Sequence, residues 1–210
     1  MAGRTRIKIC GMTESYEIKK AVDAGVDAIG FIFVKASPRY IQPEQAQEII
    51  RELPPFVDAV GVFVDEDADV VDDIAQYCGL TVLQHHGKES PEYCAKMSRR
   101  VVKAFQVNDR LSSELLDSYK DVVWGYLLDT YRKDMVGGTG EVFDWTVIEK
   151  LNIKRPLILA GGLDEKNVAA AINLVHPFCV DVNSGIETAP GKKDIKKIDK
   201  LVREVAQLVT

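Results

Sequence analysis

Short apolar segments alternate eight times with longer segments of helical pattern, and this alternation is the feature that most constrains the fold. The expected strands cover residues 6–10, 27–33, 58–64, 81–84, 101–105, 122–128, 156–160 and 179–182. The expected helices cover residues 14–24, 42–53, 67–77, 91–98, 112–119, 145–151, 164–175 and 194–208. Strands that alternate with helices run parallel, and eight such units predict a closed (β/α)8 TIM barrel of the α/β class. We expect one compact domain over residues 1–210.

An open, doubly wound sheet is the alternative arrangement for alternating strands and helices. It is disfavoured because no G-x-G-x-x-G turn follows the first strand. Local signals support the expected helix boundaries. Thr13, Ser90 and Asp164 are candidate N-caps, and Gly25 and Gly79 are candidate C-terminal caps.

Composition excludes several classes of partner. The net charge is −5 and 46% of the residues are hydrophobic, which is typical of a globular protein without the basic stripe of a nucleic-acid-binding surface. No apolar run approaches the ~20 residues that a membrane span needs, and Met1 to Thr5 does not read as a secretory signal. We therefore expect a cytoplasmic protein that binds neither nucleic acid nor membrane.

The four cysteines show neither a C-x-x-C pair nor the spacing of zinc ligands. We expect free thiols and no metal site. Cys78, Cys94 and Cys179 belong to no motif and are expected to be unreactive, whereas Cys10 ends the first strand.

The active site of such a barrel lies at the carboxyl ends of its strands. Those ends are expected to carry Cys10, Arg39, Gln84, His86, Asp129 and Asp181. Cys10 and Asp129 are a candidate proton-transfer pair, because a thiol near positive charge can act as a base and a desolvated aspartate can act as an acid. Lys8 is expected to point to the other side of its strand. Taken singly, Cys10 reads as a small core residue and Asp129 as a helix cap or structural ion pair.

Two glycine-bearing turns predict a phosphorylated substrate. Many barrels hold phosphate with backbone N–H groups in the loops after strands seven and eight. Here those loops carry Gly161-Gly162 and Ser184-Gly185, and Ser184 adds a hydroxyl donor. The alternative is that these glycines only form tight turns.

Motifs along the whole chain show a family resemblance. They are Lys8-Ile9-Cys10-Gly11, Ser37-Pro38-Arg39, Gln84 with His86-Gly87, Leu128-Asp129, Gly137-Gly138-Thr139-Gly140 with Phe143-Asp144-Trp145, Leu159-Ala160-Gly161-Gly162-Leu163, and Ser184-Gly185-Ile186-Glu187 with Gly191-Lys192-Lys193-Asp194. In this order they resemble phosphoribosylanthranilate isomerase of tryptophan biosynthesis.

The resemblance implies an Amadori rearrangement of N-(5-phosphoribosyl)anthranilate to 1-(2-carboxyphenylamino)-1-deoxyribulose 5-phosphate, the third step of tryptophan synthesis from chorismate. By analogy Asp129 is the general acid and Cys10 the general base. The resemblance implies no cofactor and no metal, because the iminium nitrogen serves as the electron sink. It is compatible with a monomer or a homodimer.

The resemblance also assigns the remaining contacts. Arg39 would bind the anthranilate carboxylate, although by itself it reads as a surface arginine. Gln84, His86 and Asp181 would contact the substrate, while Gly161, Gly162, Ser184 and Gly185 would bind the phosphate. Residues 137–140 would form a mobile lid or a loop on the phosphate side, or only a flexible connection.

Two positions depart from the family pattern. His85 stands where a leucine is usual and is expected to face away from the substrate, and Asn183 stands where a serine is common, which would change the hydrogen bonds of the phosphate turn. Two hypotheses remain besides the isomerase, and the second is another phosphosugar barrel enzyme. An epimerase would need metal-binding histidines at several strand ends, and an indoleglycerol-phosphate synthase would need a lysine at a strand end, where Lys8 and Lys103 do not lie. A non-catalytic protein that binds an anionic ligand or a protein partner is the third hypothesis.

Overall fold

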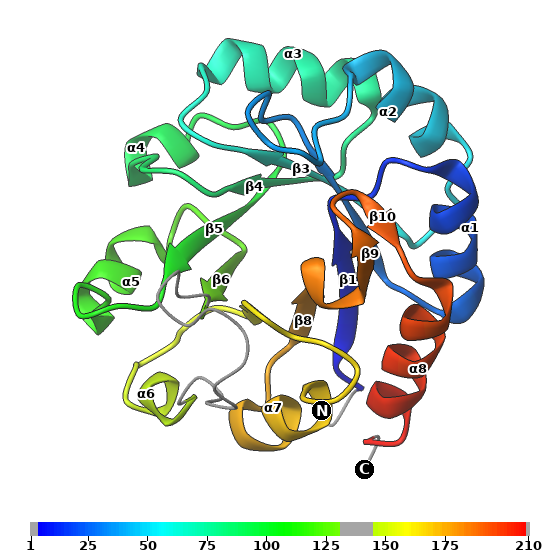
Figure 1. Cartoon of the computed structure of the whole chain (residues 1–210). Coiled ribbons are helices and arrows are strands. Elements are labelled where there is room, and N and C mark those ends of the chain that lie inside the picture. The colour runs from blue at the N-terminus through cyan, green and yellow to red at the C-terminus, as the bar shows by residue number, and fades with distance from the viewer. Residues whose placement is uncertain (1–3, 131–144, 209–210) are drawn as a thin grey trace.

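The computed structural model describes residues 4–130 and 145–208, and its eight long strands close into a parallel barrel in chain order (Figure 1). The barrel strands are β1 (Arg6–Cys10), β2 (Ala28–Ile32), β3 (Asp58–Phe63), β4 (Val82–His85), β5 (Arg100–Gln106), β6 (Gly125–Asp129), β7 (Leu157–Ala160) and β8 (Cys179–Val182). The helices are α1 (Ser15–Ala24), α2 (Pro43–Arg51), α3 (Ala68–Cys78), α4 (Pro91–Cys94), α5 (Ser113–Tyr119), α6 (Thr146–Glu149), α7 (Val168–Val175) and α8 (Ile195–Ala206). The predicted (β/α)8 barrel is confirmed, and the doubly wound alternative is wrong.

The apolar core has an outer part and an inner part, because successive residues of a strand point to opposite faces. Ile7 and Ile9 of β1 belong to the large cluster between the strands and the helices. Inside the barrel the apolar contacts form two smaller clusters, whose buried members are Cys10, Ile32 and Val62 in one and Ala104, Leu127, Ile158, Ala160 and Cys179 in the other. The buried polar side chains of Lys8, Gln84 and Asp181 also point into the barrel interior. The barrel interior therefore contains charge that a purely structural core would exclude.

Most of the predicted caps are confirmed. The Ser90 hydroxyl accepts a hydrogen bond from the N–H of Tyr93 (3.2 Å), and Pro91 is the first residue of α4. Gly25 and Gly79 end α1 and α3 in the left-handed conformation, with φ of 103° and 77°.

Two predicted caps are wrong for a physical reason. Helix α1 begins only at Ser15, and the Thr13 hydroxyl instead donates to the carbonyl of Gly191 (3.3 Å). Helix α7 begins at Val168, so Asp164 caps the turn before it, where its carboxylate accepts the N–H groups of residues 166 and 167. The Thr13 side chain is therefore used in a tertiary contact, and the Asp164 side chain is used in the turn that precedes its helix.

A small hairpin that the sequence did not predict follows β8. It consists of the 3-10 turn η1 (Ser184–Ile186) and the antiparallel strands β9 (Glu187–Ala189) and β10 (Lys192–Lys193). Figure 1 shows the hairpin at one end of β1, and the bond between Thr13 and Gly191 joins it to the segment after β1. The hairpin thus brings residues of the last barrel unit to the end of the first strand. Among residues 4–130 and 145–208, no helix has both the length and the apolar character to cross a membrane.

Candidate active site

Cys10 is the last residue of β1 and is buried, with 5% of the residue exposed. The N–H of the next residue, Gly11, donates to the carbonyl of Gly30 (2.9 Å) and Gly11 has a φ of +69°. A Cβ on Gly11 would lie 2.7 Å from Cδ of Arg39. Glycine is needed here both for the left-handed backbone and because the arginine stem passes so close to the end of β1.

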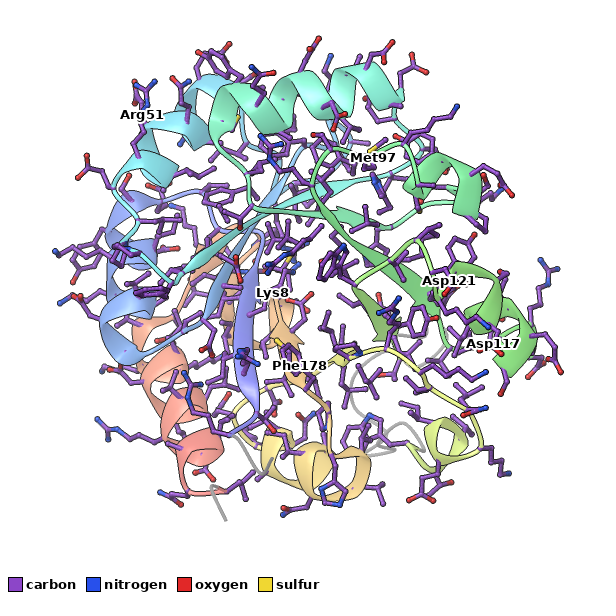
Figure 2. All side chains as sticks on the ribbon, turned by 180° about the vertical axis from the view of Figure 1, so that it is seen from behind. Lys8, Arg51, Met97, Asp117, Asp121 and Phe178 are labelled. Carbon is purple, nitrogen blue, oxygen red and sulfur yellow. The ribbon has the colours of Figure 1, made fainter. Side chains whose placement is uncertain are left out.

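Lys8 faces the barrel interior with Cys10, so the prediction that it points to the other side of the strand is wrong. Residues two apart in a strand share a face. Lys8 and Asp181 are register partners on β1 and β8, and Lys8 Nζ lies 2.8 Å from Asp181 Oδ2. Both side chains are buried, at 5% and 7% exposure, and Figure 2 places Lys8 within the ring of strands. A buried ion pair therefore lies beside the thiol.

Opposing influences act on the pKa of the Cys10 thiol. Burial is the largest and raises this pKa, the Lys8 ammonium lowers it, and the Asp181 carboxylate raises it. The net pKa of the thiol is above the ordinary value, because burial outweighs the nearby positive charge. Burial also lowers the pKa of Lys8, but Asp181 and Cys10 outweigh burial and raise it, so Lys8 carries its charge at neutral pH.

Asp129 ends β6 and lies near His86, which follows β4. The separation of His86 Nε2 and Asp129 Oδ2 is 3.5 Å, and both side chains are partly exposed. The amide nitrogen of Gln84, a buried residue, lies 3.0 Å from His86 Nδ1. Because an amide nitrogen can only donate, a neutral His86 carries its proton on Nε2, facing the carboxylate. The structure thus brings Gln84, His86 and Asp129 together.

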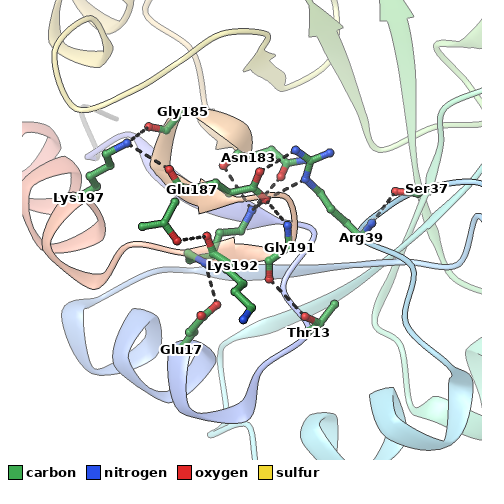
Figure 3. A network of polar contacts seen from close by, with 12 residues as sticks. Thr13, Glu17, Ser37, Arg39, Asn183, Gly185, Glu187, Gly191, Lys192 and Lys197 are labelled. Atoms are coloured by element: carbon green, nitrogen blue, oxygen red, sulfur yellow. Dashed lines mark hydrogen bonds and ion pairs between the residues drawn. The ribbon is translucent and has the colours of Figure 1, made fainter.

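Arg39 is held by the hairpin (Figure 3). Its Nε donates to Glu187 Oε1 (2.8 Å) and its Nη2 to Glu187 Oε2 (2.6 Å). Lys193, whose side chain is 0% exposed, also donates to Glu187 Oε1 (2.8 Å). Burial raises the pKa of Glu187, but the hydrogen bonds from Arg39 and Lys193 outweigh it and lower the pKa to about 2. The carboxylate is therefore ionised and fixes the guanidinium.

The two glycine turns lie against each other. Gly161 and Gly162 have φ of 97° and 65°, conformations that favour glycine. A Cβ on Gly185 would lie 2.0 Å from the carbonyl oxygen of Leu163, the residue after the first turn. Nothing lies within 4 Å of the position that a Cβ on Gly162 would take. The contact sets the turns after β7 and β8 side by side, as a two-loop anion site requires.

The structure shows the surroundings of the two residues that depart from the family pattern, Asn183 and His85. Asn183 Oδ1 accepts a hydrogen bond from Lys193 Nζ (2.8 Å), so its side chain stabilises the hairpin. His85 is fully buried outside the barrel between Phe63 and Tyr93, with ring centroids 6.5 and 5.2 Å away, as predicted from strand alternation. Cys78, Cys94 and Cys179 are free and buried, and burial raises the pKa of each thiol.

Sequence reasoning missed Lys8, Glu187 and Lys193. Lys8 was within reach, since the i, i+2 rule alone places it beside Cys10. Nothing local identifies Glu187 and Lys193 as neighbours of Arg39. The expected lid, residues 137–140, lies outside the described residues. Within the described part of the chain, no group of three or more His, Cys, Asp or Glu side chains is placed to hold a metal ion.

Comparison with known proteins shows the family to which the chain is similar. Residues 7–204 match the family model described as N-(5'phosphoribosyl)anthranilate (PRA) isomerase. A protein from Geobacter sp. (strain M21), named N-(5'-phosphoribosyl)anthranilate isomerase, is 50% identical over 204 residues, which cover 97% of this chain and 99% of that protein.

Solved structures with similar folds also belong to phosphoribosyl anthranilate isomerases. The crystal structure of phosphoribosyl anthranilate isomerase from Thermotoga maritima has a TM-score of 0.88 and 42% identity, over 97% of this chain and 100% of that one. A phosphoribosyl anthranilate isomerase solved with reduced 1-(o-carboxyphenylamino)-1-deoxyribulose 5-phosphate has a TM-score of 0.83 and 38% identity, with the same coverage.

Proposed function

The chain belongs to the N-(5'-phosphoribosyl)anthranilate isomerase family of tryptophan biosynthesis, and we propose that it converts phosphoribosylanthranilate by an Amadori rearrangement in which Asp129 and Cys10 transfer the protons. The solved relative with reduced 1-(o-carboxyphenylamino)-1-deoxyribulose 5-phosphate supports the substrate class. The product is the corresponding 1-(2-carboxyphenylamino)-1-deoxyribulose 5-phosphate.

Asp129 is the general acid. Its carboxyl group gives a proton to the furanose ring oxygen while the bond between that oxygen and C1 breaks, which leaves a Schiff base between C1 and the anthranilate nitrogen. His86 Nε2, 3.5 Å from Asp129, donates to the carboxylate that forms. Gln84 supports this role because its amide orients the imidazole.

Cys10 is the general base. The thiolate takes the proton from C2, and the electron pair of that bond forms the C1=C2 double bond of an enolamine while the iminium nitrogen is neutralised. The enolamine then gains a proton at C1 and loses one from the C2 hydroxyl, so the rearrangement is balanced without an oxidant or reductant. Each positioned transfer contributes roughly 10²–10⁴-fold to the rate.

Three groups hold the ends of the substrate. Arg39 binds the anthranilate carboxylate through Nη1 and the second N–H of Nη2, because Glu187 already accepts from Nε and from the other N–H of Nη2. Asp181 Oδ1, which is buried without a hydrogen-bond partner among the described residues, accepts a substrate hydroxyl. Gly161 and Gly162 bind the phosphate through backbone N–H groups, with Ser184 and Gly185 on its other side.

The observation that carries this proposal is the arrangement of Cys10 and Asp129 on strands β1 and β6, whose carboxyl ends open on the same end of the barrel as the paired glycine turns. The test is turnover of freshly generated phosphoribosylanthranilate by the purified chain, followed by anthranilate fluorescence in the presence of EDTA. Turnover well above the buffer blank supports the proposal. A folded protein with no turnover contradicts it.

Three further points stay predictions. The reaction needs no metal and no cofactor, so EDTA should leave the rate unchanged. The protein works in the cytoplasm. It is a monomer or a homodimer, which sedimentation of the purified chain distinguishes.

A further inference from the structure

A lysine inside the barrel lies beside the thiol that the proposed function uses. A Cβ added to Gly30 of β2 would lie 2.9 Å from Cys10 Sγ and 3.1 Å from Lys8 Nζ. The thiol and the ammonium group therefore flank one point in the barrel, which stays open only because residue 30 is glycine. Lys8 is 4% exposed, so its charge acts through little water.

We propose that Lys8 is a positioning residue for proton abstraction, whose ammonium group, fixed by Asp181, stabilises the thiolate form of Cys10. The inference rests on the proposed role of Cys10 as the general base. It goes beyond that role because it names the group that makes a buried thiol usable as a base.

The ion pair with Asp181 gives Lys8 a fixed position. A lysine side chain has four rotatable bonds and would otherwise lose considerable entropy to hold one place. Because Asp181 is the register partner of Lys8 on the neighbouring strand, the 2.8 Å contact fixes Nζ, which lies 3.1 Å from the Gly30 Cβ position that the thiol also borders. The carboxylate uses one oxygen for this contact.

Other charges reach the thiol as well. Lys193 lowers the pKa of Cys10, and an ionised Cys10 raises the pKa of Arg39. Both cations are already bound by Glu187, which offsets their charge. Asp181 acts in the opposite direction to Lys8, so the two ends of one ion pair have opposite effects on the thiol.

Because Lys8 and Asp181 act on the thiol in opposite directions, their substitutions should shift the pKa of Cys10 in opposite directions. A merely structural role for Lys8 would not produce these opposite shifts. The rate of Cys10 alkylation by iodoacetamide is measured against pH in substrate-free protein, with the Cys10 peptide quantified by mass spectrometry so that the other three cysteines do not contribute. In Lys8→Met the midpoint should rise by about one to three pH units. In Asp181→Asn it should fall.

Lys103→Met is the matched control. Lys103 is also a buried strand lysine, at 3% side-chain exposure, paired with Glu89 at 3.2 Å. Its neighbours Val102 and Ala104 face the barrel interior, so Lys103 points outward. Its substitution removes a similar ion pair and should leave the Cys10 midpoint unchanged.

An unchanged midpoint in Lys8→Met overturns the inference. If that variant does not fold, Lys8→Met/Asp181→Asn is compared with Asp181→Asn, because the double variant leaves no unpaired buried charge. The midpoint should then be higher in the double variant, and equal midpoints overturn the inference.

Activity provides the second readout. At neutral pH the kcat/KM of Lys8→Met for phosphoribosylanthranilate should fall tenfold or more, and part of the loss should be recovered as the pH rises, which a merely disordered site would not do. If the unsubstituted chain shows no turnover, the proposed function fails while the alkylation profile still decides the role of Lys8.

Discussion

Arg39 and Glu187, which are 148 residues apart in the sequence, form a two-bond ion pair that fastens the loop after β2 to the hairpin after β8. Thr13 adds a second link, from the segment after β1 to Gly191 of the same hairpin. Three segments from distant parts of the chain therefore hold the guanidinium at the edge of the site. Among the described residues both hydrogen bonds of the guanidinium go to Glu187, so we expect the position of Arg39 to depend on Glu187.

Substitution of Glu187 tests this dependence. Glu187→Gln keeps the shape but leaves Arg39 and the buried Lys193 without a counter-charge, so we expect a KM about tenfold higher with little change in kcat. The free energy of unfolding should fall by about 3 kcal/mol, the lower end of the range for a broken buried ion pair. Steady-state kinetics and urea unfolding measure both, with Glu52→Gln at an exposed position as the control. An unchanged KM would show that Glu187 does not position Arg39.

Removal of the guanidinium should have a larger effect on binding. Arg39→Ala deletes the charge-assisted bonds to the anthranilate carboxylate, and such bonds contribute about 1.5–3 kcal/mol each. We expect KM to rise more than in Glu187→Gln, with the smaller effect on kcat. An Arg39→Ala enzyme with the parent KM would remove Arg39 from the substrate site.

Gly185 provides a test of the phosphate site. In Gly185→Ala the new Cβ would meet the carbonyl oxygen of Leu163 at 2.0 Å, a backbone atom that cannot move without its turn. The turns after β7 and β8 should separate, so the KM for phosphoribosylanthranilate and the inhibition constant of inorganic phosphate should both rise about tenfold or more. Gly25→Ala, in the left-handed cap of α1 with nothing within 4 Å, is the control for backbone strain alone. Equal effects of the two substitutions would argue against a phosphate site at Gly185.

His85 should make stability depend on pH. Burial is the main cause that lowers its pKa to about 4, whereas the unfolded chain has a His pKa of about 6.5. Between these values the unfolded chain binds a proton that the folded chain does not, so the free energy of unfolding decreases as pH falls through this window, by about 3 kcal/mol in all.

His85→Leu should abolish that pH dependence and stabilise the fold, because both ring nitrogens are buried without partners among the described residues. Catalysis should be unchanged, since the side chain lies outside the barrel. Thermal unfolding at several pH values measures the effect, and His176→Asn on a left-handed surface residue is the control. A pH dependence that survives in His85→Leu would assign it to other groups.

The barrel was predictable because its strands are apolar runs bounded by clear turns, as in residues 27–33, where the structure has Ala28–Ile32. The hairpin was not, because β9 and β10 are three and two residues long and owe their pairing to Glu187 and its partners. The inward position of Lys8 was readable from strand alternation and was misassigned. The partner of Arg39 was beyond reach, since no local pattern reports a contact across 148 residues.

The most direct test of the central claim compares kcat/KM for phosphoribosylanthranilate in the parent chain, Cys10→Ala and Asp129→Asn, with EDTA present and circular dichroism as the check on folding. The account predicts that each substitution reduces kcat/KM by about 10²–10⁴-fold while the fold is retained. A folded Cys10→Ala or Asp129→Asn protein with activity within about threefold of the parent would contradict the role assigned to that residue.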